Sequence, residues 1–470
     1  MSFLSLLFIL VFLTLGIAVY SKAQKPLRNA VIFVMNLVFY AWAGLRVLAL
    51  LLVATLVAWG VALAFDQVQK VPARRAILAA AVVALVAVPV GVRGLGAFGY
   101  AAAFPVGYGE LPWLVAPAGV SIFSLQLVSY VCDVYLGTIE PERRFVRVLL
   151  YASMFHLATV GPLMRFEQMS QAFDKRSFTK AGFFAGTRRL AVGLAKAVLL
   201  ALPCGECADA LLPQGLEALS RQSTAGLWLG MLFYVLEVYL SLSALSDMAL
   251  GMGRIMGFTY PPDFDHPYQA GSVHEFCSRW FKSLRMFFRD YVFVPLGYAT
   301  RQQSTLTFVR DYLIVGALIG VWYGLSWNYV AWSLVLSAVV LVERLLVAEH
   351  LPEAAGRVLG HLTTPVIVFL SMLLLRFGDV GELACAFAGM FGHAGGGAAG
   401  LQASTVLLNN VFLLALGIIA CTDVGVRLRT AWFERSQGNI VLFRLLRVCE
   451  LVTPTLLALL SIIALVGGAA

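Results

Sequence analysis

Charged residues are scarce in this sequence of 470 amino acids. Asp, Glu, Lys and Arg make up 13% of it, against about 25% in a typical soluble domain. Hydrophobic residues make up 60%, and the mean hydropathy is +0.86. A chain of this composition cannot cover a surface that faces water. The composition therefore excludes a soluble enzyme, a disordered chain and a disulfide-rich secreted module.

Apolar runs take the place of charge. Runs of about 20 residues recur along the whole length, so the sequence predicts an all-α polytopic membrane protein. The alternating segments of about ten residues that are typical of a transmembrane β-barrel are missing. Several runs are short for a full crossing. We therefore expect about eleven spans in one domain over residues 1–470, with some segments re-entrant or interfacial. The runs are Ser2–Tyr20, Ala30–Phe65, Ala76–Val92, Leu111–Val131, Val146–Val160, Leu190–Leu202, Gly226–Leu245, Leu313–Val321, Val330–Leu346, Thr364–Leu375, Ser404–Ala420 and Leu451–Val466.

Two runs near the start need interpretation. Ser2–Tyr20 has no basic segment before it and no small-residue cleavage site, so we expect a retained first helix and not a signal peptide. Ala30–Phe65 is too long for one span. Gly44 and Arg46 interrupt it, which predicts a hairpin of two helices.

The net charge of +9 indicates a membrane surface and not a nucleic acid. No basic stretch offers the surface needed to track a duplex, so we expect no nucleic-acid partner. Basic residues gather in segments between runs, at Lys22–Arg28, Lys70–Arg75, Glu140–Arg147 and Arg427–Arg447. Cytoplasmic loops are enriched in Lys and Arg, so these segments are predicted to be cytoplasmic and in contact with anionic lipid.

The seven cysteines are scattered. Cys204 and Cys207 have the spacing of a redox or metal pair, but no second pair or nearby His completes a zinc site. We therefore expect no metal site. The alternative interpretation is a pair of small apolar residues at a helix end.

The centre of the chain, Ser246–Trp332, breaks the apolar pattern. The prolines of Tyr260–Tyr268 exclude a regular helix there. In Arg279–Tyr291, helical spacing separates two faces. Its bases are Arg279, Lys282, Arg285 and Arg289, and its apolar face contains Trp280, Phe281, Leu284, Phe287, Phe288 and Tyr291.

Two interpretations of this amphipathic segment stay open. It is either an interfacial helix with its bases among lipid head groups, or a re-entrant helix whose basic face binds an anionic cytosolic donor. The two are compatible. Trp322 and Tyr323 lie in an aromatic stretch, Gly320–Tyr329, whose simpler interpretation is an interfacial aromatic belt.

His156 is the most notable histidine, because it lies in an apolar run. An ionisable group in such a run is a functional candidate. A buried neutral His bonded to a carbonyl group is the interpretation we favour.

Ordered blocks along most of the chain resemble the membrane-bound O-acyltransferase (MBOAT) family. The resemblance is to its bacterial branch, which includes the alginate O-acetylation and teichoic-acid D-alanyl transfer membrane proteins. The blocks are Phe39–Gly44, Ala118–Ser124, Ser129–Tyr135, Gly161–Arg165, Ser246–Gly251, Phe264–Tyr268 and Phe288–Gly297.

The resemblance implies about eleven helices around a central tunnel in a bacterial inner membrane. It implies no bound cofactor. An acyl-CoA or acyl carrier protein thioester would approach from the cytoplasm and bind at the basic face, Arg279 to Arg289. The acyl group would reach a hydroxyl acceptor, or a periplasmic or extracellular partner in a polysaccharide complex. Residues expected along the tunnel are Trp280, Phe281, Trp322, Asp265, His266 and Asp290.

The sequence departs from the family at two expected histidines. Tyr323 occupies the position of the near-universal catalytic His, in Trp322-Tyr323-Gly324, and Phe281 that of a second His. An imidazole has a pKa near neutrality, whereas a phenol has one near 10 and is rarely ionised without a helper. Tyr323 could instead donate a hydrogen bond to a carbonyl oxygen.

Three functions follow from these residues. The first is acyl transfer to an envelope polysaccharide, with slow or relocated chemistry in place of the missing histidines. The second is a catalytically inactive scaffold or adaptor in an envelope polysaccharide complex. The third, a transporter that uses the same tunnel, is disfavoured because no long internal repeat is found.

Overall fold

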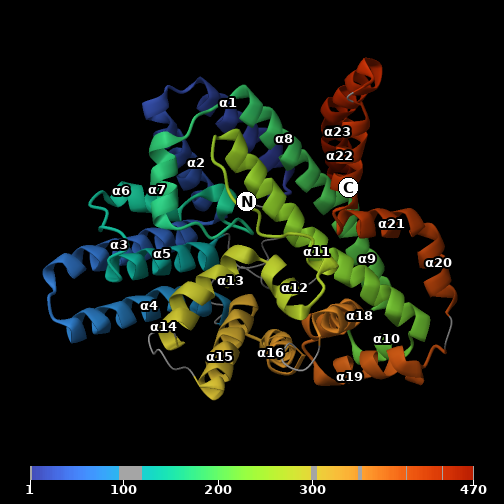
Figure 1. Ribbon diagram of the computed structural model, residues 1–470. Coiled ribbons are helices and arrows are strands. Elements are labelled where there is room, and N and C mark those ends of the chain that lie inside the picture. Colours follow the sequence, from blue (N-terminus) through green and yellow to red (C-terminus); the bar gives the residue numbers. More distant parts are fainter. Residues whose placement is uncertain are drawn as a thin grey trace.

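The computed structural model describes residues 3–94, 119–297, 304–347, 352–397, 400–436 and 438–468. These residues are almost entirely helical and include no strand, which confirms the predicted fold class. Figure 1 shows the N-terminal helices on one side, α11 through the centre, and the C-terminal helices on the other side. The α-helices are α1 (Thr14–Lys22), α2 (Arg28–Ala43), α3 (Leu45–Gln67), α4 (Val71–Gly94), α5 (Val120–Tyr135), α6 (Phe145–Ala152), α7 (Phe166–Lys175), α8 (Lys180–Ala195), α9 (Leu202–Leu211), α10 (Leu216–Ser220), α11 (Thr224–Ile255), α12 (Val273–Arg279), α13 (Lys282–Phe288), α14 (Val294–Gly297), α15 (Thr305–Tyr323), α16 (Trp327–Val342), α18 (Glu353–Arg376), α19 (Val380–Ala388), α20 (Leu401–Asn409), α21 (Val411–Ala420), α22 (Val424–Ser436) and α23 (Ile440–Gly467).

Nine helices in the described ranges are long and apolar enough to cross a membrane. A tenth is counted if α20 and α21, which are bent by 65°, form one span. The chain is therefore a multi-pass membrane protein, with slightly fewer spans described than the expected eleven. The run Val146–Val160 folds as the short α6 and a turn at Phe155–Leu157. The run Leu111–Val131 lies partly outside the described residues.

The predicted hairpin within Ala30–Phe65 is confirmed. Helix α2 ends at Ala43 and α3 begins at Leu45, and the residue between them, Gly44, has a φ of 136°. Side chains rarely tolerate this conformation, so glycine is the residue that permits the sharp reversal.

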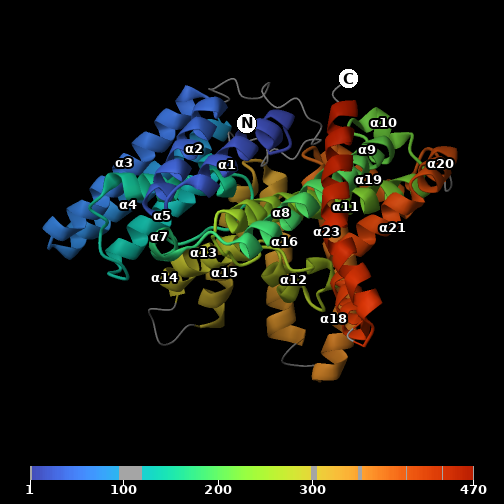
Figure 2. The same ribbon diagram turned by 90° about the horizontal axis from the view of Figure 1, so that it is seen from above.

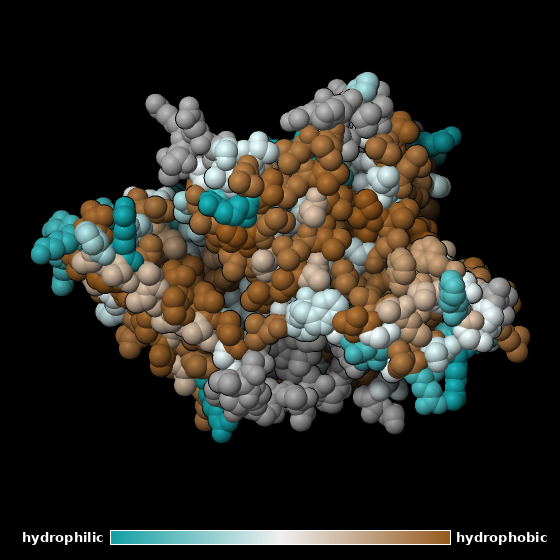
Figure 3. Space-filling model, turned by 90° about the horizontal axis from the view of Figure 1, so that it is seen from below, coloured by the Kyte–Doolittle hydropathy of each residue, from teal (hydrophilic) through white to brown (hydrophobic). Residues whose placement is uncertain are grey.

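Helix α11 forms the core of the molecule and packs closely against α8. A side chain at Gly251 would place its Cβ only 2.6 Å from the backbone nitrogen of Leu190. At Gly186 of α8, a Cβ would lie 2.6 Å from the backbone oxygen of Gly251. Small residues let helices in a membrane approach in this way. The face shown in Figure 3 is largely apolar, with hydrophilic residues gathered toward its edges.

The basic segments that the sequence places between runs lie on one side of the molecule. The Arg28 guanidinium lies over Phe178 in the loop between α7 and α8, and Arg147 pairs with Asp174 of α7. Gln269 joins the central loop to Asp423 before α22 by two hydrogen bonds. We call the side of the molecule on which these segments lie the basic side. Figure 2 shows α15, α16, α18 and α23 running in broadly the same direction, as spans do.

Candidate functional site

A break in the helix at Trp280 and Phe281 shapes the site. Helix α12 ends at Arg279 and α13 begins at Lys282, and Phe281 between them has a left-handed φ of 43°. The prediction of one continuous amphipathic helix over Arg279–Tyr291 is therefore wrong. Helical spacing could not reveal the break, because contacts distant in sequence stabilise it.

Asp263 stabilises the break. Its carboxylate accepts hydrogen bonds from the Ser283 backbone N–H at 2.8 Å and from the Ser283 hydroxyl at 3.0 Å. The Lys282 N–H donates to the Asp263 carbonyl oxygen at 2.9 Å. Burial raises the pKa of the Asp263 carboxyl to about 7, against these hydrogen bonds, which lower it. A left-handed non-glycine residue costs about 1–3 kcal/mol, and this set of bonds offsets that cost.

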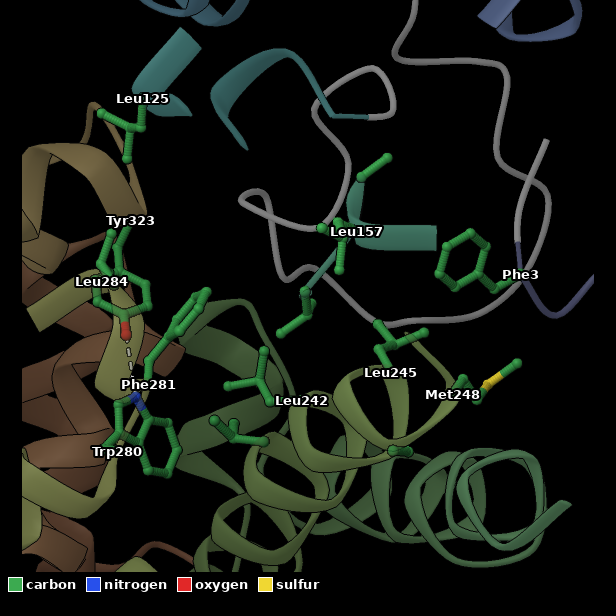
Figure 4. Close-up of a cluster of buried hydrophobic side chains, with 14 of the residues drawn as sticks. Phe3, Leu125, Leu157, Leu242, Leu245, Met248, Trp280, Phe281, Leu284 and Tyr323 are labelled. Atoms are coloured by element: carbon green, nitrogen blue, oxygen red, sulfur yellow. Dashed lines mark hydrogen bonds between the residues drawn. The ribbon is translucent and has the colours of Figure 1, made fainter. Parts of the chain in front are cut away.

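Trp280 and Tyr323 meet at the centre of the site. The Trp280 indole N–H donates to the Tyr323 hydroxyl at 3.0 Å, and both side chains are buried, as Figure 4 shows. The Trp332 ring packs edge-on against Tyr323 at 5.3 Å, and the Phe264 ring against Trp280 at 5.6 Å. Because an indole nitrogen only donates, the Tyr323 oxygen accepts in this bond.

A cavity of about 250 Å³ begins at this pair. Its inner end is aromatic and is lined by Trp280, Phe281, Tyr323 and Trp332. On α15 its lining extends from Phe308 to Tyr323, fifteen residues or about 22 Å of helix. Its outer end is cationic and is lined by His274, Arg285, Arg289 and Arg344. We call it the Tyr323 cavity.

Arg285 is the most available cation of the cavity. Among the residues that the structure describes, its guanidinium has no hydrogen bond or ion pair. Arg289 pairs with Asp290 at 2.8 Å, and Arg344 lies 4.0 Å from the centre of the Phe308 ring. Burial and the nearby Arg285 lower the pKa of His274. His274, Arg344 and Asp263 were not predicted as site residues, because only the fold brings them to the cavity or its wall.

The other two predicted donor-binding bases lie elsewhere. Arg279 pairs with Glu275 at 2.6 Å, one turn earlier on α12. Lys282 pairs with Asp265 at 2.8 Å and lines a separate cavity of about 150 Å³ on the other side of α13. The break at Phe281 turns these bases away from Arg285. Only Arg285 and Arg289 of the predicted basic face line the Tyr323 cavity.

The remaining predicted tunnel residues lie outside the lining of the Tyr323 cavity. The Trp322 ring packs on Phe281 at 5.4 Å. Asp265 is largely exposed, and the hydrogen bond from Lys282 lowers its pKa. His266 holds the turn before Pro267 with a left-handed φ of 46°. Asp290 forms ion pairs with Arg165 and Arg289.

His156 lies apart from the Tyr323 cavity. Its Nε2 is 2.9 Å from the Tyr260 hydroxyl, and its ring lies beside Gly253 near the end of α11. Tyr239, which contacts Trp280, is fourteen residues earlier on that helix, or about 21 Å away. This position favours the predicted structural role for His156, but its partner is the Tyr260 hydroxyl and not a carbonyl group.

Comparison with known proteins identifies a family domain in this chain. Residues 142–348 match the family model described as MBOAT, the membrane-bound O-acyltransferase family. This chain carries an MBOAT domain. The matched residues include α6 to α16, so the MBOAT domain contains every residue that lines the Tyr323 cavity.

This chain is similar to proteins from bacteria. It is 31% identical over 337 residues to a probable alginate O-acetylase AlgI of Pseudomonas fluorescens, which covers 71% of this chain and 64% of the relative. It is 27% identical over 440 residues to the protein of that name in Azotobacter vinelandii, covering 91% and 85%. It is 26% identical over 378 residues to a peptidoglycan O-acetyltransferase of Helicobacter pylori, covering 72% and 69%.

No group of three or more His, Cys, Asp or Glu side chains that could hold a metal ion occurs in the described part of the MBOAT chain. The chemistry that the cavity offers comes from its aromatic hydroxyl, its indole N–H and its cations.

Proposed function

We propose that this protein transfers an acyl group from a thioester donor on the basic side to a hydroxyl group of an envelope polysaccharide. Its place would be the bacterial inner membrane, with the basic side toward the cytoplasm. The observation that carries the proposal is the two-ended Tyr323 cavity within the MBOAT domain. An acyl-CoA or an acyl carrier protein presents a neutral thioester at the end of an arm that carries phosphate. The aromatic inner end suits the thioester, and Arg285 suits the phosphate.

The proposed reaction needs no bound cofactor. The acceptor hydroxyl oxygen attacks the thioester carbonyl carbon, the carbon–sulfur bond breaks, and the proton of the hydroxyl ends on the leaving thiol. The Tyr323 hydroxyl donates a hydrogen bond to the carbonyl oxygen as negative charge develops there. Trp280 positions the phenol for that donation through the 3.0 Å bond.

The test is labelled acyl transfer in proteoliposomes that contain the full chain. Acetyl-CoA or an acetylated acyl carrier protein would be added to the basic side, with alginate or peptidoglycan fragments and co-purified partners as acceptors. We expect transfer that requires the protein. Tyr323→Phe should lower it about 10- to 100-fold, because removing an oxyanion donor has effects of this order or larger. Tyr135→Phe is the matched control, since Tyr135 lies outside the cavity. Absence of transfer with every donor and acceptor would refute the proposal.

The second function that we propose as an alternative is a catalytically inactive scaffold or adaptor in an envelope polysaccharide complex. The observation that favours it is that Phe281 and Tyr323, at the inner end of the cavity, are not bases near neutral pH. A scaffold predicts that a partner co-purifies equally with the wild type and with Tyr323→Phe, and that Tyr323→Phe supports normal polysaccharide modification in cells. Loss of modification in that variant at normal expression would exclude the scaffold.

A further inference from the structure

Three arginines from three helices converge on one carboxylate outside the lining of the Tyr323 cavity. Glu450 of α23 lies 3.3 Å from Arg188 of α8, 2.7 Å from Arg429 of α22 and 3.2 Å from Arg447 of α23. We call these four residues the Glu450 cluster. None of the four lines the Tyr323 cavity, and the proposed acyl transfer does not use them.

The Glu450 cluster has more positive charge than it can neutralise internally. One carboxylate faces three guanidinium groups, which leaves a surplus of two positive charges. The Glu450 side chain is 17% exposed, whereas those of Arg188, Arg429 and Arg447 are 41%, 55% and 61% exposed. The carboxylate thus sits inside, and guanidinium N–H groups remain available outside. Such groups bind phosphate oxygens with good geometry.

The cluster lies at the depth of lipid head groups. The apolar part of α23 that follows Glu450, residues Leu451–Val466, spans about 24 Å, most of a hydrocarbon core of about 30 Å. Glu450 and Arg447 are therefore at its boundary. Helix α22 has too many charges to cross a membrane, yet it exposes Trp432 and Leu428. Those features are typical of a helix that lies in the interface.

Aromatic rings hold the outer arginines beside this surface. The Arg447 guanidinium lies 5.5 Å from the centre of the Phe433 ring and 5.2 Å from that of Phe443. The Arg429 guanidinium lies 6.0 Å from Phe433, and the two rings pack edge-on at 6.2 Å. The rings position the cations and offer an apolar contact for the upper part of an acyl chain.

We propose that the Glu450 cluster binds the phosphate of an anionic phospholipid in the leaflet on the basic side. The surplus charge, the interfacial depth and the flanking aromatic rings together favour a lipid over a soluble anion. An acidic protein would meet the same charges, but α22 and α23 present Trp432, Leu428 and a lipid-facing span beside them. The site does not depend on acyl transfer.

The test is native mass spectrometry of the delipidated full chain titrated with phosphatidylglycerol, with phosphatidylcholine as the neutral comparison. The test variant is Arg429→Gln with Arg447→Gln, which leaves the Arg188–Glu450 pair to keep the carboxylate partnered. The control variant is Arg143→Gln with Arg144→Gln, the same loss of charge at exposed residues elsewhere on the basic side. We expect the wild type and the control to retain phosphatidylglycerol in preference to phosphatidylcholine. The test variant should bind phosphatidylglycerol at least tenfold more weakly, because each lost arginine should weaken binding about fivefold.

Each other outcome overturns the proposal. Equal phosphatidylglycerol binding by the test variant and the wild type would show that the cluster is not the site. Inorganic phosphate that displaces the lipid at equal concentration would assign the cluster to a soluble anion. Loss of acyl carrier protein binding in the test variant with unchanged lipid binding would assign it to an acidic protein.

Discussion

Helices α11 and α23 look alike in sequence and lie in opposite environments. Both are long, with 32 and 28 residues, and both are apolar, with hydropathy values of 1.6 and 2.2. Yet 78% of the residues in the apolar stretch of α11 are buried within the protein, against 6% of those in the apolar stretch of α23. Buried α11 carries small and polar residues, among them Gly251, Ser241 and Asp247. Length and hydropathy therefore identify a span, while small residues decide whether it packs against protein or lipid.

The largest expected difference concerns two acids, one in the loop after α11 and one just before α22. Asp263 follows α11 and is buried, with a pKa raised to about 7, whereas Asp423 precedes α22 and has a pKa lowered by its hydrogen bond with Gln269. Because the pKa of Asp263 is raised in the folded state, its carboxyl contributes to stability. The contribution is complete at pH values below the unfolded-state pKa of about 4. That stabilisation is lost as pH rises through 7. The total loss in the free energy of unfolding is at most about 4 kcal/mol and is reached at high pH.

Asp263→Asn should remove this pH dependence, because an amide keeps the acceptor for Ser283 without titrating. Melting temperatures of the wild type and the variant between pH 5 and 8 would measure it. The wild type should lose stability relative to Asp263→Asn as pH rises. Asp423→Asn should behave in the opposite sense, with the wild type losing its advantage as pH falls toward the usual range of a carboxyl. Parallel curves for wild type and Asp263→Asn would refute this account.

The next difference tests the close packing of α11. Gly251→Ala should destabilise the protein by about 2–3 kcal/mol, because the new Cβ would meet the backbone nitrogen of Leu190 at 2.6 Å. Gly467→Ala in α23 is the matched control, since nothing lies within 4 Å of its Cβ position. Thermal unfolding in one detergent would compare them. A similar loss in both variants would contradict the assigned environments.

The smallest expected effect is that of Leu459→Ala in α23. Leu459 of α23 is 53% exposed toward the surface, whereas Leu240 of α11 is fully buried. Leu459→Ala should change stability by no more than about 0.5 kcal/mol, as expected for a position without packing partners. Leu240→Ala provides the contrast, because it leaves a cavity in the core. The same thermal measurement checks both, and a large loss for Leu459→Ala would indicate that α23 packs against another protein.

The sequence predicted the elements of the site better than their arrangement. Apolar runs predicted the spans, and Gly44 predicted the α2–α3 turn, because both depend on local chemistry. Trp280, Phe281 and Tyr323 line one cavity, whereas the other residues expected along the tunnel, Trp322, Asp265, His266 and Asp290, do not line it. The break at Phe281 was missed, because Asp263 stabilises it from eighteen residues away. The Glu450 cluster joins residues up to 262 positions apart, which no spacing rule reveals.

The most direct test of the account is the donor dependence of acyl transfer in Arg285→Gln. Arg285 lines the outer end of the Tyr323 cavity and has no partner among the described residues, so its loss should leave the fold intact. With a thioester supplied only on the basic side, the account predicts a KM for the donor raised about tenfold or more and a kcat within about twofold, since a charged hydrogen bond to the donor is lost. Arg143→Gln should match the wild type. An unchanged KM in Arg285→Gln would contradict entry of the donor through this cavity.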